Sequence, residues 1–429
     1  MQVRLLGGLV LFITTLYCGP RPRTGTGRGR EGSGLYPELA VLGFSEGSSP
    51  ALASRVARTA ALLPSYQVAR DELARDGVPL NIKEVRRVAR QQGFELLATR
   101  KKDLECFRAG KMSCGTELKG KRVGVAIDGG RVRIRVTIRK KKDKRTGKKR
   151  RLKIRTEWRE PKLLIIFEMD KRGRMVRRSR PWIDGTFQGP DECVELLAMH
   201  LHRLGAAKAK LVTFVSDGAP WIWDRLEWVE KRVGLQAKRV VRVLDWCHAV
   251  HHVSLALEAL GLPPQERQQR YRQLRGWLKA GRVYHVTAEL SLLAEACSPD
   301  PQVWTDIAFL EKHAQAGHMQ YRKFRKDGVA LGSGAIESAI RRVVNLRLKG
   351  NGILWEIENA EAMLVLRAAA LTGRWEETLS HSWQTLVGDR RLDWKWHSPD
   401  IPGELNSHVP ITPPKPQSQP APSAARKPA

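Results

Sequence analysis

The sequence predicts a mixed α/β protein with additional helical regions on either side of its sheet, and three observations support this fold class. Strand-like apolar or alternating runs fall between residues 122 and 217 and again at 240–244. Helix-period patterns begin at residue 49 and return from residue 250. The first strands follow one another as hairpins and the later ones alternate with helices, an order typical of a sheet with parallel and antiparallel strands.

Composition predicts a protein that binds polyanions. The 429 residues include 76 Lys and Arg against 44 Asp and Glu, a formal net charge of +32, and 42% of the residues are hydrophobic. This length and apolar content predict two or three domains. The excess of cations favours nucleic acid as the partner, with an anionic membrane surface as the alternative. Six cysteines without a C-x-x-C pair argue against a disulfide framework or zinc ribbon and favour the reducing cytoplasm.

Residues 1–48 are predicted to form an irregular N-terminal region. Leu5–Tyr17 is apolar and follows Arg4, like a signal peptide, but it lacks a small-residue cleavage site and precedes a strongly basic chain. It is also shorter than the roughly 20 residues that a membrane span needs. We therefore expect a strand-like part of a folded region, with export as the less favoured alternative. Gly19–Gly34 is rich in Gly, Arg and Pro and is predicted to be a loop or linker.

Residues 49–118 are predicted to be helical. A helix at Ser65–Arg75 and another from Asn81 flank a turn at Asp76–Leu80, and Asn81 is a suitable N-cap. This arrangement resembles a helix-turn-helix. A helical hairpin with a solvated basic face explains the pattern equally well. In the first interpretation, the DNA contacts of the second helix are Arg86, Arg87 and Arg90.

Residues 119–250 are predicted to form the core that contains the sheet. Arg131–Arg139 alternates with period two, which places its Val and Ile side chains on one face. Residues 139–155 then hold 12 Lys or Arg in 17 positions, as in the charged tip of a long hairpin. This tip is expected either to grip phosphates or to be a disordered, solvated loop. Its candidate DNA contacts are Lys140, Lys141, Lys142, Lys148, Lys149 and Arg150.

The rest of the chain continues the alternation of strands and helices. The continuous apolar run Leu211–Val215 predicts a central strand that is covered on both faces. Other strands are expected at 163–167, 181–187 and 240–244, and helices at 191–204, at 221–231 and from Asp245. Residues 251–330 are predicted to be an all-helical insertion, 331–396 a helical part of the core, and 397–429 a disordered tail rich in Pro, Ser and Ala.

Three acidic residues are candidate metal ligands. Asp128 and Asp217 each follow an apolar strand and precede glycine, and Glu337 opens a helix among small residues. Carboxylates held on a sheet and a facing helix are the oxygen ligands with which two Mg²⁺ ions position a phosphate. Each also has a structural alternative: an Asp-Gly turn at Asp128, an N-cap at Asp217 and a solvent-facing side chain at Glu337.

Other polar residues near these segments are given different roles. Asp184 has the same Asp-Gly form, but its strand is less continuous, so we expect a structural role. Asp245 opens a helix on which His248 and His252 share one face. A His-x-x-x-His pair can bind zinc, but no third ligand or zincin Glu accompanies it. His248 is expected to hydrogen-bond an acid or a phosphate near the metal site, or to be a satisfied core histidine.

Together these segments resemble the bacterial insertion-sequence transposases of the DDE class, closest to the Kra-type group and more distantly the Mutator-like transposases. The resemblance extends over residues 35–376, and the combination of motifs is more specific than any one of them. The motifs are Ile127–Arg131, Trp158–Lys162, Phe214–Trp223, Leu244–His252, Gly334–Ser338, Arg347–Gly352, Trp355 and Leu366-Arg367.

The resemblance implies an RNase H-like core in which Asp128, Asp217 and Glu337 form the catalytic triad. It implies DNA strand cleavage and strand transfer with Mg²⁺, for which Mn²⁺ substitutes, by a homodimer or larger assembly on DNA. The D-x-x-H signature shared with Mutator-like enzymes corresponds to Asp245 and His248. Such a protein is expected in the cytoplasm, associated with the nucleoid and not with a membrane.

Two further features complete the comparison with that family. Arg347 and Lys349, which follow Glu337, are expected to contact phosphates. His251 stands where an acid is expected, and only Cys18 remains of a cysteine-rich N-terminal segment that relatives often carry. Two alternative functions stay open: an RNase H-like nuclease or resolvase that does not join strands, and a decayed, non-catalytic DNA-binding relative.

Overall fold

The structure is a computed structural model that describes residues 1–18, 21–22, 30–31, 36–44, 47–138, 153–297 and 300–392. Two predictions lie outside the described residues: the six basic contacts at the hairpin tip, and the tail at 397–429. The chain separates into two units, Met1–Arg391 and Leu392–Ala429, and every feature below belongs to the first.

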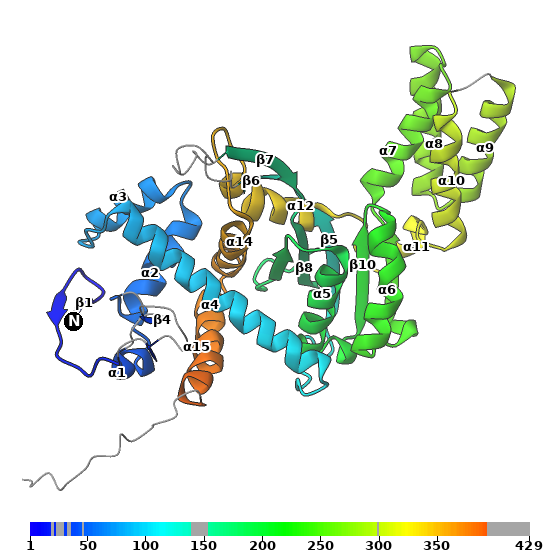
Figure 1. Ribbon diagram of the computed structural model, residues 1–429. Coiled ribbons are helices and arrows are strands. Elements are labelled where there is room, and N and C mark those ends of the chain that lie inside the picture. Colours follow the sequence, from blue (N-terminus) through cyan, green and yellow to red (C-terminus); the bar gives the residue numbers. More distant parts are fainter. Residues whose placement is uncertain are drawn as a thin grey trace, which may run out of the picture. The chain divides into compact units, whose positions relative to one another are not determined.

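A five-stranded sheet with the strand order β11-β10-β5-β8-β9 carries the candidate site (Figure 1). β10 pairs in parallel with both β5 and β11, whereas β8 runs antiparallel to β5 and β9. The prediction of a mixed α/β fold is therefore confirmed. The strands are β5 (Arg122–Gly129), β8 (Lys162–Met169), β9 (Trp182–Thr186), β10 (Leu211–Ser216) and β11 (Val240–Leu244).

Burial on both faces explains why the middle strands are continuous apolar runs. Residues 123–127 of β5 and 162–167 of β8 are all buried. Gly124 lies opposite Phe167 in the antiparallel register. A Cβ at position 124 would lie 2.3 Å from the Cζ atom of Phe167, so glycine is needed where this ring crosses the strand.

Helices pack against the sheet from several parts of the chain. α5 contacts β8 and β9, α14 contacts β9, and α12 contacts β5 and β8. The helices predicted at 191–204 and 221–231 are confirmed as α5 and α6. The bounds are α5 (Pro190–Leu204), α6 (Pro220–Val233), α12 (Gly334–Ile340), a π-helical segment (Arg341–Asn345), α13 (Leu346–Leu348), α14 (Ile357–Leu371), α15 (Trp375–Leu392), and short 3-10 helices at Ala206–Lys208 and Ala237–Arg239.

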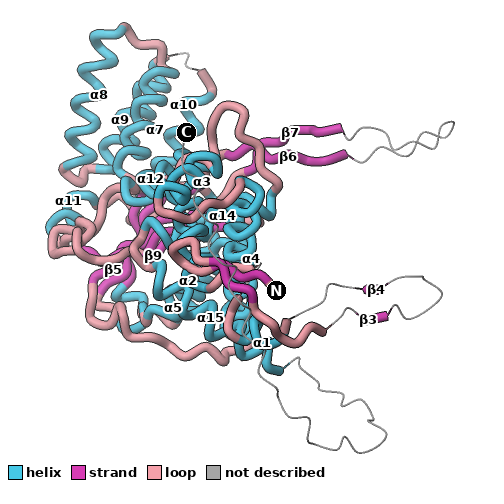
Figure 2. The backbone as a smooth tube through the Cα atoms, turned by 90° about the vertical axis from the view of Figure 1, so that its left-hand side faces the viewer, coloured by secondary structure: helices cyan, strands magenta, loops and turns pink. Residues whose placement is uncertain are grey.

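The basic alternating strand belongs to a separate two-stranded hairpin of β6 (Val132–Ile138) and β7 (Lys153–Arg159). Figure 2 shows this hairpin extending away from the helices. Val132 and Ile134 are buried, but Ile138 is 40% exposed. The predicted strand is confirmed, whereas the prediction of a continuous buried face is wrong for its outer half, because that half extends beyond the body of the fold.

Residues 49–118 contain three helices, α2 (Pro50–Leu62), α3 (Tyr66–Arg75) and α4 (Ile82–Arg108). The Asn81 side chain accepts from the Glu84 backbone N–H, and the Glu84 side chain accepts from the Asn81 N–H, which completes a capping box. The predicted cap is therefore confirmed. α4 does not end as a short second helix, however, but runs to Arg108 and packs against α14.

Residues 1–48 contain more regular structure than expected. The short elements are β1 (Gln2–Arg4), β2 (Val10–Phe12), β3 (Arg21–Pro22), β4 (Arg30–Glu31) and α1 (Pro37–Val41). Within Leu5–Tyr17 only β2 is a strand, and it pairs antiparallel with β1. None of the helices in the described part of the chain has the length and apolar character that crossing a membrane requires.

The predicted helical insertion is a set of helices that pack on one another beside the sheet (Figure 1). α7 contacts both α8 and α10, and α9 contacts the same two helices. The predicted boundary at residue 250 falls inside α7, which therefore belongs to both regions. The bounds are α7 (Trp246–Ala259), α8 (Pro264–Lys279), α9 (Val283–Ala296), α10 (Gln302–Gln315) and α11 (Tyr321–Lys326).

Candidate functional site

Three parallel strands each end in an aspartate at the same edge of the sheet. Val215 of β10 lies opposite Ala126 of β5, so Asp217 comes opposite Asp128 two residues later. Ser216 likewise lies opposite Leu244 of β11, and Asp245 follows directly. The carboxyl ends of parallel strands are where α/β sheets place their sites, because the chain leaves the sheet there and exposes side chains.

Glu337 reaches this edge from α12. The helix contacts β5 and β8, and Glu337 lies in its first turn. A Cβ at Gly130, just after β5, would lie 3.3 Å from Val344 Cγ1, so glycine permits the close approach of this helical segment. The predicted helix that carries Glu337 is therefore confirmed.

Each candidate ligand is held by neutral donors through one carboxylate oxygen. Asp128 accepts from the Gly129 N–H at 2.6 Å, and Asp217 accepts from the Ala219 N–H at 2.9 Å. Glu337 accepts from the Ser333 hydroxyl at 2.9 Å. Within the described residues, no hydrogen bond reaches the second oxygen of any of the three, and none of them forms an ion pair.

The three acids influence one another electrostatically. The pKa of Asp128 is raised from its usual 3.8 to about 6, mainly by burial. The negative charges of Asp217 and Glu337 contribute to this rise, and the Gly129 hydrogen bond opposes it. His248 also lies in this neighbourhood and lowers the pKa of Asp128. Folding therefore brings the predicted triad and His248 into one electrostatic environment.

The acids do not form a ready-made ligand cluster. Among the described residues, no group of three or more His, Cys, Asp or Glu side chains is close enough together to hold a metal ion. Mutual repulsion and the hydrogen bond from Ser333 to Glu337 both favour separation of the carboxylates. The oxygen donors are of the kind that Mg²⁺ prefers, but the side chains have to converge to share an ion.

The raised pKa of Asp128 leads to a test of stability. In metal-free buffer, Asp128→Asn is expected to raise the free energy of unfolding at pH 7 by about 1 to 2 kcal/mol, allowing for partial solvent exposure. Between pH 3.8 and about 6 the folded chain binds this proton more tightly than the unfolded chain, so wild-type stability falls as pH rises. Urea unfolding should show a higher free energy of unfolding for Asp128→Asn than for wild type at pH 7 but not at pH 4. An equal difference at both pH values would contradict a raised pKa of Asp128.

Asp245 joins the end of β11, the start of α7 and the approach to α12. Its Oδ1 accepts from both the backbone N–H of His248, at 2.8 Å, and the His248 ring, at 3.0 Å, and its Oδ2 accepts from the Ser333 N–H at 2.5 Å. Asp245 is 1% exposed. Burial alone would raise its pKa, but these hydrogen bonds lower it. The D-x-x-H spacing is thus a helix cap whose first-turn histidine folds back onto the capping acid.

His248 is not a core residue. Its side chain is 41% exposed, and its Nδ1 atom is the one that pairs with Asp245. The Asp245 hydrogen bond raises the pKa of His248, and Asp217 and Asp128 add to this effect. The core alternative for His248 is therefore wrong, and the ring is close enough to the acids to respond to their charge.

His252 belongs to the packing of the insertion. Its Nδ1 atom lies 2.7 Å from Asp306 Oδ1, and its ring stacks on Phe309 at 3.8 Å between centroids. Phe309 also reaches the candidate site, since a Cβ at Gly218 would lie 2.5 Å from its ring. Gly218 has a φ of 93°. The residue after Asp217 is therefore glycine both for its backbone conformation and for this contact, which the sequence alone did not indicate.

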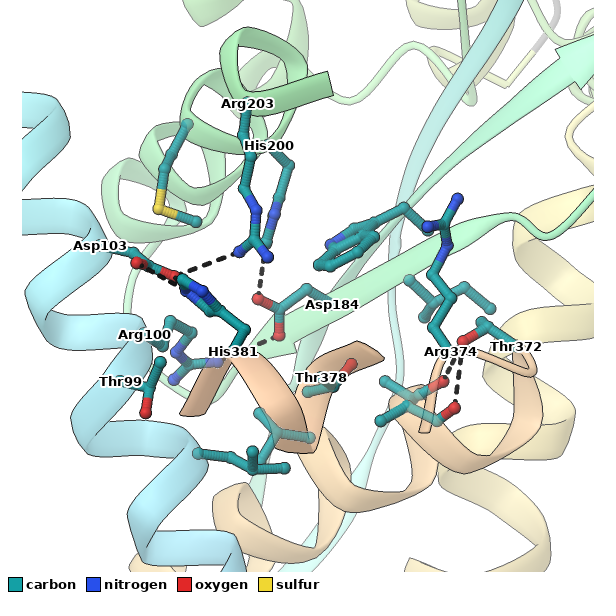
Figure 3. Close-up of a pocket in the computed structure, with 17 residues that line it drawn as sticks. Thr99, Arg100, Asp103, Asp184, His200, Arg203, Thr372, Arg374, Thr378 and His381 are labelled. Atoms are coloured by element: carbon teal, nitrogen blue, oxygen red, sulfur yellow. Dashed lines mark hydrogen bonds and ion pairs between the residues drawn. The ribbon is translucent and has the colours of Figure 1, made fainter. Parts of the chain in front are cut away.

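The rival acid Asp184 points to the other face of the sheet. It pairs with Leu164, which pairs with Ile127, so it shares the face of Ile127 and not that of Asp128. Figure 3 shows Asp184 between His200 and Arg100. His200 Nε2 lies 2.8 Å from Asp184 Oδ2, and Arg100 Nη1 donates to its Oδ1 at 3.2 Å.

A cavity of about 70 Å³, lined by both apolar and charged side chains, lies beside Asp184 and is large enough for a few water molecules. Ion pairs balance the charges of the arginines around it. Arg100 pairs with Asp184 and Glu361, Arg203 pairs with Asp103 at 3.2 Å, and Arg374 pairs with Glu377 at 2.9 Å and also with Glu117. This balance supports the structural role expected for Asp184.

The cations proposed to bind DNA differ in exposure. Arg86 and Arg87 are exposed on α4, and Arg90 is half-buried with its guanidinium over the Phe94 ring at 5.5 Å. Lys349 is exposed. Arg347 is only 3% exposed, and its guanidinium lies over the rings of both Tyr66 and Trp355, at 4.9 and 5.1 Å from their centroids. The prediction of a direct phosphate contact by Arg347 is wrong for this structure, because its guanidinium is enclosed by aromatic rings.

The difference in exposure between Lys349 and Arg347 predicts different salt slopes for substitutions at these two positions. Lys349→Gln is expected to reduce the slope of log affinity against log salt for duplex DNA by about 0.9, as for one lost phosphate contact. Arg347→Met keeps the stem that packs on the rings and should leave the slope unchanged. Fluorescence anisotropy at several salt concentrations measures both slopes. A reduced slope for Arg347→Met alone would reverse the assignment.

The candidate site was also compared with known proteins. No model of a known protein family matches this chain, and no curated protein is significantly similar to it. The function therefore has to be argued from the residues and their geometry.

Proposed function

We propose that this protein is a DNA transposase of the DDE class with an RNase H-like core. The observation that carries the proposal is the set of three acids, Asp128, Asp217 and Glu337, that share one electrostatic environment without a cationic partner among the described residues. A strongly basic chain that leaves these three carboxylates unpaired supports a role in holding cations beside a polyanion. The placement of Asp128 and Asp217 on adjacent parallel strands supports the core assignment.

The donor set fits Mg²⁺ in its chemistry, and Mn²⁺ is expected to substitute. Two bound ions would neutralise phosphate charge and lower the pKa of the attacking water or 3′-hydroxyl. Asp128 and Asp217 would anchor the two ions. Glu337 would complete the ligand set of the second ion once its carboxylate no longer accepts the hydrogen bond from the Ser333 hydroxyl. The free second oxygens of all three acids are the atoms available for this purpose.

Asp245 and His248 have supporting roles in the proposal. Asp245 is a positioning residue, because it binds Ser333 and so sets the start of the helix that carries Glu337. With Nδ1 paired to Asp245, His248 has its Nε2 available to hydrogen-bond a phosphate oxygen near the acids. The partner is DNA, with transposon ends and target as substrates of a homodimer or larger assembly in the cytoplasm, associated with the nucleoid.

The decisive experiment uses purified full-length protein and an oligonucleotide duplex cut from the DNA that flanks the coding region. A pre-cut 3′-OH end should be joined to plasmid DNA in the presence of Mg²⁺ or Mn²⁺ and not in EDTA. Metal-dependent cleavage without joining would support the nuclease or resolvase alternative. DNA binding without either reaction would support the non-catalytic alternative.

A further inference from the structure

A groove of about 640 Å³ lies between the insertion and the segments that hold the candidate site. On one side it is lined by residues of α8 and α11, and on the other by Trp246, Cys247 and Leu331-Gly332. Trp246 and Gly332 are the neighbours of Asp245 and Ser333, which share a hydrogen bond. The groove therefore begins beside the polar link that positions Glu337.

The groove is strongly basic. Four exposed cations line it, and no Asp or Glu among the described residues does so. None of the four forms an ion pair with a described acid, unlike Arg270 on the same helix, which pairs with Glu289 at 2.6 Å. The four cations are Arg272, Arg275, Lys279 and Arg325. Unpaired cations that converge on one concave surface favour an anionic occupant over a merely solvated face.

The spacing of these cations fits a single nucleic-acid strand. Positions 272, 275 and 279 lie on one face of α8, and seven residues of helix rise about 10 Å. Phosphates of one strand follow one another at about 3.4 Å along a duplex axis, so this row is as long as about three such steps. The groove has the size of clefts that hold small ligands, about 300 to 1,000 Å³, so it can accept a few nucleotides of one strand.

Two further lining residues suit a nucleotide strand. Trp246 is half-buried and held edge-on by Tyr321 at 4.9 Å, so its ring is a fixed platform for base stacking. Gly276 lies between Arg275 and Lys279, and a Cβ there would meet nothing within 4 Å. The missing side chain leaves the helix surface open at the middle of the basic row.

Cys247 connects the groove with the acids. Burial raises the pKa of its thiol, Asp245 and Glu337 raise it as well, and Arg275 lowers it. The thiol therefore lies within electrostatic range of both the basic row and the helix that carries Glu337. A strand bound along α8 would continue toward the candidate metal ligands.

We propose that this groove, the α8 channel, binds a single DNA strand through its phosphates and leads it to the site of Asp128, Asp217 and Glu337. The inference rests on the proposed function for the identity of the polymer as DNA. It assigns the helical insertion a role in substrate binding, with Trp246 stacking on a base and Arg272, Arg275 and Lys279 contacting successive phosphates.

The first test measures binding without catalysis. Fluorescent oligo(dT) is titrated with full-length protein in EDTA at several salt concentrations. The double variant Arg272→Gln and Arg275→Gln should weaken binding roughly tenfold and reduce the salt slope by about 1.4, at about 0.7 per single-strand contact. Gly276→Phe should weaken binding without any change of charge. The matched control is the double variant Arg282→Gln and Lys312→Gln, two exposed cations of the insertion outside the groove, which should bind like wild type.

The second test places the strand directly and uses the unmodified groove. Oligo(dT) that carries a disulfide-linked thiol should cross-link to Cys247 faster than to Cys106, an exposed cysteine on α4 that does not line the groove. Equal cross-linking rates at the two cysteines, or wild-type affinity of the groove variants, would overturn the α8 channel. The transposase proposal would then still be decided by the strand-joining experiment. Failure of the wild type to bind any DNA would overturn both. Tighter binding of oligo(U) RNA or of phosphatidylserine vesicles than of oligo(dT) would also overturn the channel.

Discussion

Asp217→Asn is expected to reduce metal-dependent strand joining by at least about a thousandfold, because the neutral amide removes one anchor of the proposed ions and several kcal/mol of transition-state stabilisation. The substitution preserves size and can keep the hydrogen bond from the Ala219 N–H, so folding should be unaffected. DNA affinity in EDTA should stay the same or rise, since a negative charge is removed beside a polyanion. Single-turnover joining with a pre-cut 3′-OH end measures the chemical effect.

The matched control is Asp224→Asn, the same change at an exposed acid of α6. It should join strands at the wild-type rate. If Asp217→Asn joins strands as fast as Asp224→Asn, Asp217 holds no essential ion and its assignment to the catalytic triad is wrong. Loss of DNA binding by Asp217→Asn would instead indicate a local unfolding of the β10–α6 turn.

The second large effect is on stability, at the acid on the opposite face of the sheet. Asp184→Leu is expected to lower the free energy of unfolding by about 3 to 5 kcal/mol, because it leaves Arg100 and His200 buried without the carboxylate that pairs with both. Asp184 is 6% exposed and His200 3% exposed, so bulk solvent does not screen the charges left behind. Urea unfolding followed by tryptophan fluorescence measures the change.

A surface pair between α5 and α6 is the control for this prediction. Asp191→Leu removes an acid that is 79% exposed and pairs with Arg225 at 2.6 Å. It should cost no more than about 1 kcal/mol, because solvent screens an exposed pair and replaces its hydrogen bonds. If Asp184→Leu unfolds like wild type but no longer joins strands, the roles assigned to Asp184 and Asp128 have to be exchanged.

Local pattern was sufficient for the order of the elements in the core. The apolar runs that became β8 and β10 were recognisable because almost all of their residues are buried, so that few polar positions interrupt them. Asn81 was recognisable as a cap because the capping box is formed by residues three positions apart. Asp128, Asp217 and Asp184 were also recognisable from local sequence, because each is an acid before glycine in or directly after a strand.

Packing between distant segments was not recognisable from local pattern. Arg347 resembled an exposed phosphate contact in sequence, yet Tyr66 and Trp355 enclose it. The length of α4 beyond Arg90 depends on its contact with α14, far along the chain. The basic row on α8 had no significance in sequence, because helical residues with positive charge are usually solvated. The structure indicates a binding role for this row because the row lines the same groove as Trp246 and Cys247.

The sequence by itself determined the mixed α/β class, the strands that end in acids and the strong positive charge of the chain, because periodicity and composition are local or additive properties. Only the tertiary structure decided which acids share a face. Strand register places Asp217 opposite Asp128 and turns Asp184 away, and Asp245 holds the approach to α12 through Ser333. These relations depend on long-range pairing, since side chains in a sheet alternate between faces and a shift of one residue would reverse them.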